Sequence, residues 1–120
     1  MLKKLFILCA LAVSPALAGE TTIGDDGLHK TDWMRDTFRD MTEDLEEAHA
    51  EGKRFMVIIE QRGCIYCTKM HEEVFPNPEI KAMIEENYFV VQVTMFGDTE
   101  LTDFAGEPLA EKDTISKWTI

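Results

Sequence analysis

The sequence predicts an α/β fold in which a central, mainly parallel sheet is flanked by helices. Two apolar runs rich in β-branched residues read as strands buried on both faces, which is typical of parallel sheets. These runs are Phe55 to Ile59 and Tyr88 to Met95. Segments with helical periodicity precede, separate and follow the runs, and this alternation favours parallel pairing between the strands.

The first helix is expected to begin at Asp32, which can cap it, and to end near Gly52. Apolar residues in this segment recur every three or four positions, so they share one helical face. They are Met34, Phe38, Met41, Leu45 and Ala48. Before this helix, residues 19–31 form a polar lead whose Gly24-Asp25-Asp26-Gly27 sequence predicts a turn or a flexible arm.

The strand Phe55 to Ile59 runs through a short polar loop into Cys64. We expect this strand in the middle of the sheet, with Cys64 at its carboxyl end where a helix begins. Open α/β sheets hold their functional sites at this edge. Cys67 follows one helical turn later, and Met70 and Val74 continue the helical stripe.

The remaining elements follow from capping and breaking residues. Asn77 can cap a second short helix with Pro78 in its first turn, and the buried side of this helix is Ile80, Met83 and Ile84. After the second strand, the polar stretch Phe96 to Asp113 is expected to be loop. Thr114 to Trp118 reads as the last turns of a helix.

The first 18 residues are expected to be a secretory signal peptide, followed by the lead at 19–31 and one domain at 32–120. The signal has a basic start, an apolar run from Leu5 to Val13, and the small residues of Ala16-Leu17-Ala18 before the cleavage point. Cys9 lies in the apolar run and would be lost with it. Cys64 and Cys67 then remain, in a compartment that permits disulfides.

The charge balance narrows the range of partners. Asp and Glu number 23 against 12 Lys and Arg, for a formal net charge of −11. Such a surface repels phosphate backbones and anionic lipid, which disfavours nucleic-acid binding and membrane-surface binding. No stable membrane anchor is expected after signal cleavage.

The spacing of Cys64 and Cys67 at a helix start predicts thiol–disulfide exchange. Only the thiolate attacks a disulfide, and the unpaired N–H groups of a helix amino terminus stabilise that anion. Cys64 would therefore attack, and Cys67, one turn along, would resolve the mixed disulfide. Arg62 is a candidate source of further positive potential. No cofactor and no metal is expected for this chemistry.

Two alternatives stay open. A metal-binding or carrier protein for zinc or copper would use Cys64, Cys67 and His71, with a fourth ligand from His29, His49 or a carboxylate. Without a metal, His71 reads as a half-exposed residue on an acidic helix. The second alternative is a non-catalytic module with a structural disulfide, although a loop this short removes little unfolded-chain entropy.

Two other interpretations are set aside. Covalent haem attachment is excluded because Thr68, rather than histidine, follows Cys67. The six methionines after the signal fall on apolar faces and read as core packing rather than copper ligands. They are Met34, Met41, Met56, Met70, Met83 and Met95.

Two long segments carry a family resemblance: FMVIIEQRGCIYCTKMHEEVFPNPEI and YFVVQVTMFGDTELTDFAGEPLAEKDTISKW. Their strand-then-CxxC motif and their GD-x-E-x-TDF-x-G-x-x-x-x-EK stretch resemble the secreted thioredoxin-like proteins of the SoxW type, associated with bacterial sulfur-oxidation systems. The resemblance implies a thioredoxin fold, with Cys64 as nucleophile and Cys67 as resolving residue. It also implies a periplasmic reductase of partner-protein disulfides that receives electrons from a membrane transporter of the CcdA/DsbD kind.

The resemblance also implies elements that this sequence does not supply. Thioredoxin folds carry a cis-proline that faces the CxxC, followed by two antiparallel strands and a closing helix. We expect that proline shortly after Ile120, where the sequence ends, so the fold is expected to be incomplete at its C-terminus. Pro108 is not expected to replace it, because Leu109 to Lys117 reads as helical rather than as a strand. The strand Phe55 to Ile59 would then have one open edge.

Overall fold

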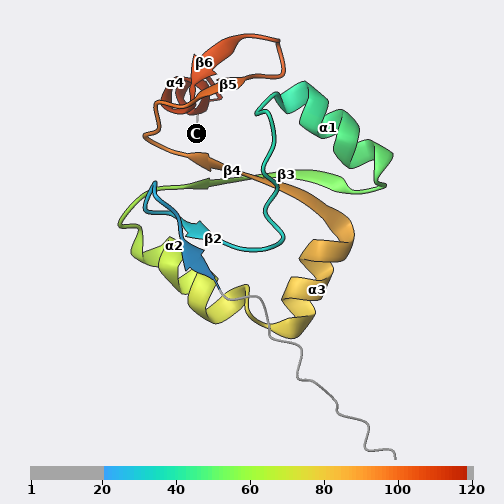
Figure 1. Cartoon of the computed structure of the whole chain (residues 1–120), viewed down its shortest axis with the longest axis vertical. Coiled ribbons are helices and arrows are strands. Elements are labelled where there is room, and N and C mark those ends of the chain that lie inside the picture. The colour runs from blue at the N-terminus through green and yellow to red at the C-terminus, as the bar shows by residue number, and fades with distance from the viewer. Residues whose placement is uncertain (1–20, 119–120) are drawn as a thin grey trace, which may run out of the picture.

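The computed structural model describes residues 21–118, so the predicted signal peptide and Cys9 lie outside the described residues. The centre of the fold is a parallel pair of strands, β3 (Arg54–Glu60) and β4 (Tyr88–Thr94) (Figure 1). They pair in register along their whole length, from Arg54 opposite Tyr88 to Glu60 opposite Thr94. The predicted α/β fold with a parallel sheet is therefore confirmed.

Helices cover both faces of this pair, because alternate strand residues point to opposite sides. On one face the strands pack against α1 (Met41–Ala50) and α4 (Glu111–Lys117), and on the other against α3 (Pro78–Asn87). The buried residues of the first cluster are Met41, Ala48, Phe89, Val91, Val93, Leu101 and Ile115. Those of the second are Trp33, Ile84 and Val90. The strands are therefore apolar on both faces, as predicted.

Among the described residues β4, and not β3, is the middle strand. Beyond its pairing with β3, β4 is met on its other side by an extended segment in which Met34 bridges Val90 and the Arg35 N–H donates to the Val90 carbonyl at 2.8 Å. The predicted central position of Phe55 to Ile59 is therefore wrong. A strand that is apolar on both faces must be covered on both faces, and here helices supply that cover. The apolar run does not require a neighbouring strand on each side, so it does not predict a central position in the sheet. The expected open edge of β3 is present in residues 21–118.

Helix α1 is shorter than predicted, since it begins at Met41 rather than Asp32. Asp40 caps it by accepting from the N–H groups of Thr42 and Glu43. The preceding segment instead runs extended beside β4, which satisfies backbone groups that a helix would have paired internally. As a result, the apolar residues predicted to share one helical face do not do so: Phe38 is 99% exposed, whereas Met41 is fully buried.

The polar lead contains an antiparallel hairpin of β1 (Thr22–Ile23) and β2 (His29–Lys30). Its turn lies at Gly24-Asp25-Asp26-Gly27, as predicted, but the segment is not the expected flexible arm. Leu28 is only 2% exposed, so the hairpin is anchored in the protein.

The CxxC helix and its successor occur where they were predicted. The first comprises α2 (Ile65–Lys69) and a π-helical continuation, η1 (Met70–Val74), and the second is α3. The Asn77 side chain accepts from the N–H groups of Glu79 and Ile80, which confirms the predicted cap. Met70 and Met83 are 40% and 48% exposed, so the expectation that every methionine packs in the core is wrong.

The stretch predicted to be loop contains a second hairpin, formed by β5 (Glu100–Thr102) and β6 (Pro108–Ala110). The prediction failed because three-residue strands are too short to show alternation. A carboxylate stabilises the turn: Asp103 Oδ1 accepts from the N–H groups of Ala105 and Glu107. Pro108 thus begins a strand, contrary to expectation, and residues 21–118 contain no cis peptide bond.

Helix α4 begins at Glu111, so the prediction of helix at Thr114 to Trp118 is confirmed except for Trp118, which is its C-cap. Among residues 21–118, no helix is long and apolar enough to cross a membrane.

The contrast between two phenylalanines tests this account of the core. Phe89→Ala removes a ring that is 1% exposed, and we expect it to lower the free energy of unfolding by about 3–5 kcal/mol. Phe38→Ala removes a ring in full contact with solvent and should change it by less than about 0.5 kcal/mol. Urea unfolding followed by circular dichroism measures both. Equal losses for the two variants would contradict the assignment of Phe89 to the core.

Candidate active site

The two cysteines lie at the start of α2 and form a disulfide, with their Cα atoms 5.3 Å apart. Gly63, just before them, has a φ of +75°, a left-handed conformation that glycine adopts without strain. This conformation lets the chain turn from the end of β3 into the helix within a few residues. The predicted position of Cys64 at a strand-to-helix junction is confirmed.

Cys64 is the N-cap residue of the helix, and its sulfur accepts a hydrogen bond from the Cys67 backbone N–H at 3.1 Å. This N–H is one of the donors that a helix start leaves unpaired. A negative charge on Sγ of Cys64 would be stabilised by the same N–H after reduction. The Cys64 carbonyl in turn accepts from both the N–H and the hydroxyl of Thr68, which fixes the first turn.

The cysteines are less exposed than the two residues between them. Between them, Ile65 and Tyr66 are exposed, with Tyr66 at 73%. Both cysteines are half-buried, so the expected contrast between an exposed Cys64 and a covered Cys67 is not observed. Cys67 lines an almost wholly apolar pocket of about 520 Å³ between β3, the CxxC helix and α3. An apolar surface beside Cys67 leaves room for an apolar side chain.

His71 is fully buried rather than half-exposed, which corrects the prediction. Its Nε2 lies 2.6 Å from Oε1 of Glu60, the last residue of β3, which is also buried. The helix turns His71 toward the strand end, so its ring stacks on His29 at 4.8 Å between centroids and contacts Phe75 edge-on. Nδ1 of His71 has no hydrogen-bond partner among the described protein atoms.

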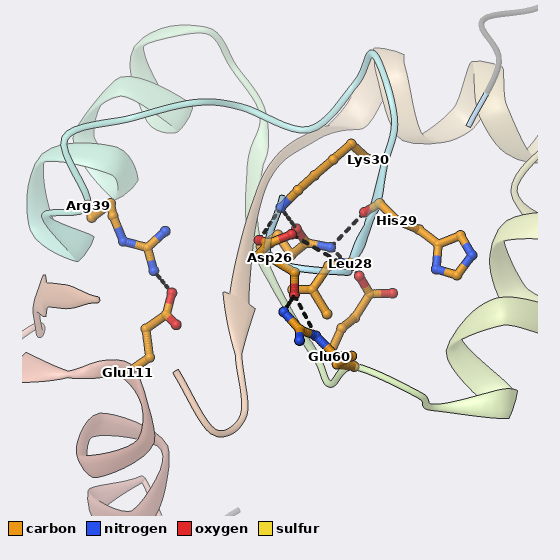
Figure 2. A network of polar contacts seen from close by, with 9 residues as sticks. Asp26, Leu28, His29, Lys30, Arg39, Glu60 and Glu111 are labelled. Carbon is orange, nitrogen blue, oxygen red and sulfur yellow. Dashed lines mark hydrogen bonds and ion pairs between the residues drawn. The ribbon is translucent and has the colours of Figure 1, made fainter. Parts of the chain in front are cut away.

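Glu60 also connects to the N-terminal hairpin through Gln92 of β4. The Gln92 side-chain amide donates to Oε2 of Glu60 and, at 2.9 Å, to the carbonyl of His29. Lys30 Nζ donates to Oε1 of Gln92 at 2.5 Å and to Asp26 at 2.7 Å. Figure 2 shows Asp26, His29 and Lys30 gathered beside Glu60. These contacts join the hairpin to the strand ends next to the cysteines.

The ionisation of Asp26 fits this network. Burial alone would raise the pKa of Asp26, but the hydrogen bonds from Lys30 and from the Leu28 N–H outweigh it, and the pKa is lowered. Asp26 is therefore a carboxylate at neutral pH and holds Lys30 in place.

Arg62, the candidate source of positive potential, donates from Nε and Nη2 to the Asp26 carbonyl at 3.2 and 3.0 Å. Its guanidinium is therefore engaged by the hairpin, two residues before Cys64.

The residues of the metal alternative do not form a cluster. Within residues 21–118, no group of three or more His, Cys, Asp or Glu side chains could hold a metal ion. Nε2 of His71 is occupied by its contact with Glu60. His49 lies exposed on α1, on a different element from the cysteines.

Sequence reasoning found the cysteines but not Glu60 or Gln92, and it named His29 only as a candidate fourth metal ligand. One signal was available: Glu60 directly follows five apolar strand residues, and a carboxylate there needs a partner if the strand is buried. No local pattern identified His71 as that partner or placed the hairpin beside it.

The family comparison agrees with this geometry. A family model described as Thioredoxin-like domain matches residues 41–119, which is more than half of the chain and includes both cysteines. No curated protein and no solved structure matches the chain significantly. The predicted likeness to thioredoxin-like proteins is confirmed, and the SoxW type stays a prediction.

The buried pair gives a stability prediction. His71→Ala leaves the Glu60 carboxyl without its imidazole partner, and an unsatisfied buried polar group costs about 1–3 kcal/mol. We expect the free energy of unfolding to fall by that amount or more, since a cavity is also created. His49→Ala, on the exposed side of α1, is the matched control and should change it by less than about 0.5 kcal/mol. Chemical denaturation measures the free energy of unfolding of both variants. A loss for His71→Ala as small as that of the control would show that the contact between His71 and Glu60 contributes nothing to stability.

Proposed function

Because the chain belongs to the family of thioredoxin-like domains, we propose that it is a thiol–disulfide oxidoreductase that reduces disulfides in partner proteins. The observation that carries this proposal is the Cys64–Cys67 disulfide at the start of α2, where Sγ of Cys64 accepts a backbone N–H. A disulfide closed over so short a loop contributes little as a structural staple, whereas a second thiol one turn from the first is well placed to resolve a mixed disulfide.

The proposed reaction begins with both cysteines reduced. The Cys64 thiolate attacks one sulfur of the partner's disulfide, and the partner's other sulfur leaves as a thiolate that takes up a proton. Cys67 then loses its proton and attacks Sγ of Cys64 in the mixed disulfide. The partner's second sulfur is released, and the Cys64–Cys67 bond forms. Two electrons pass to the partner, and a dithiol donor must return them to the cysteines.

The geometry supports different roles for the two cysteines. Cys64 is the N-cap, so its sulfur has the helix N–H to stabilise the anion that attacks. Cys67 lies one turn inside the helix and within reach of Cys64, so it can displace the partner without a large movement. It lines the apolar pocket, where a lasting charge is unfavourable, and this suits a residue that ionises only for the resolving step.

The direction, compartment and electron donor form the finer part of the proposal. The predicted signal peptide supports the periplasm, and the resemblance to SoxW-type proteins supports a reductase that a CcdA/DsbD-like membrane transporter recharges. A reductase requires a low potential, near the ~−270 mV of thioredoxin rather than the ~−120 mV of a strong oxidant.

Insulin reduction by the protein with dithiothreitol as the donor tests the activity. We expect Cys64→Ser to lower the rate to that of dithiothreitol alone, because the substitution removes the attacking sulfur. Cys67→Ser, reduced beforehand and mixed with insulin after dithiothreitol has been removed, should instead accumulate a mixed disulfide with insulin, visible on a non-reducing gel. His49→Ala controls for the handling of variants and should match the unaltered protein. Full activity in Cys64→Ser would rule out the proposal.

Equilibration with glutathione then tests the direction separately. A potential near ~−270 mV supports a reductase, and one near ~−120 mV would make the protein an oxidant.

A further inference from the structure

The N-terminal hairpin, Thr22 to Lys30, lies outside the residues that the family model matches, which begin at 41. It nevertheless contacts the chain on both sides of the redox pair. One contact is to the loop just before Cys64, and the other is to the helix just after Cys67. The reaction proposed above gives this hairpin no role.

The first contact fixes the loop that carries Cys64. Arg62 donates two hydrogen bonds to the carbonyl of Asp26 in the hairpin turn. The Arg62 side chain also lies directly on Gly27, where an added Cβ would be 2.5 Å from Nε of Arg62. Gly27 therefore permits the close approach that brings the two loops together.

The second contact fixes the helix that carries Cys67. The His29 ring stacks on His71 with an angle of 9° between the ring planes. His71 follows Cys67 by four residues, which is about one turn along the same helix. The Gln92 side chain donates to the His29 carbonyl. Because Gln92 belongs to β4, this bond fixes the backbone of His29 relative to the strand pair.

The hairpin is itself well anchored, which a positioning role requires. Leu28 is buried, and its N–H donates to Oδ1 of Asp26 at 3.0 Å. Lys30 bonds both Asp26 and Gln92, so the turn and the second strand are tied to β4. Figure 2 shows these hairpin residues between the strand ends and the segment that leads to α1.

We propose that this hairpin is a positioning element for the redox pair, with Arg62 and His29 as its positioning residues. The inference rests on the proposed function. While the disulfide is intact, the sulfur–sulfur bond itself holds the cysteines in place. Once it is reduced, the geometry that gives the Cys64 sulfur its backbone N–H depends on the loop before it and the helix after it. The hairpin holds both.

The consequence is a change in redox equilibrium. A hairpin that stabilises the Cys64 thiolate stabilises the reduced state more than the oxidised state, and such stabilisation raises the reduction potential. Loosening the hairpin should therefore lower the potential, which shifts the pair toward the disulfide.

Gly27→Ala tests the first contact. The new Cβ displaces Arg62, and we expect the equilibrium constant with glutathione to shift toward the Cys64–Cys67 disulfide by about fivefold, which is ~20 mV. Gly106→Ala is the matched control: its φ of +78° is nearly that of Gly27, at +76°, so both substitutions introduce the same backbone strain. No atom lies within 4 Å of its added Cβ. The control should leave the potential unchanged.

His29→Ala and His29→Phe test the second contact. The alanine variant loses the stack and should shift the equilibrium in the same direction as Gly27→Ala. The phenylalanine variant restores a ring over His71 and should recover at least half of the shift. Circular dichroism confirms that each variant is folded, and the two His29 variants test the positioning role even if Gly27→Ala does not fold.

The outcomes separate this inference from the proposed function. Potentials of both Gly27→Ala and His29→Ala equal to that of Gly106→Ala would overturn the positioning role, even if insulin reduction stands. The potential is measured on the cysteine pair without a protein substrate. A shift in the potential therefore supports the positioning role even if the unaltered protein fails to reduce insulin, a failure that would count against the proposed function alone.

Discussion

The parallel pairing of β3 with β4 is the constraint on which the rest of the structure depends. The ladder aligns Glu60 with Thr94, so both strands end at the same end of the sheet. The chain continues from this end of β3 through a short loop into the helix that begins after Cys64. The same ladder presents apolar side chains to helices on both faces, which forms the two buried clusters. Cys64 and Cys67 thus lie at a helix start that closely follows the packed strand pair, and both are half-buried there.

Polar groups accumulate where the two strands end. The carboxylate of Glu60 and the imidazole of His71 are buried together, and this arrangement costs desolvation free energy that the hydrogen bond between them offsets. Gln92 then connects the pair to a hairpin that the family match does not include. The domain shared with the family supplies the CxxC motif, and the residues that precede the domain supply contacts around that motif.

What the sequence could predict follows from the range of the interactions involved. Local signals predicted β3, β4, the cap at Asn77 and the position of Cys64, because each depends on neighbouring residues. The start of α1 was mistaken because helical spacing in Met34 and Phe38 competes with an edge of β4 that lies more than 50 residues away. The same limit applies to His71, since its partners come from β2 and β3. Pairings across distant segments leave no periodic trace in the chain.

The measurement that most directly tests the central claim is the pH dependence of Cys64 alkylation in the reduced protein. If the helix-start N–H stabilises the Cys64 thiolate, the alkylation rate should rise with a midpoint well below the ~8.5 of an ordinary cysteine. Mass spectrometry assigns the modified residue, and Cys67→Ser isolates its signal. A midpoint at or above ~8.5 would contradict this claim, because the helix start would then not stabilise the Cys64 thiolate.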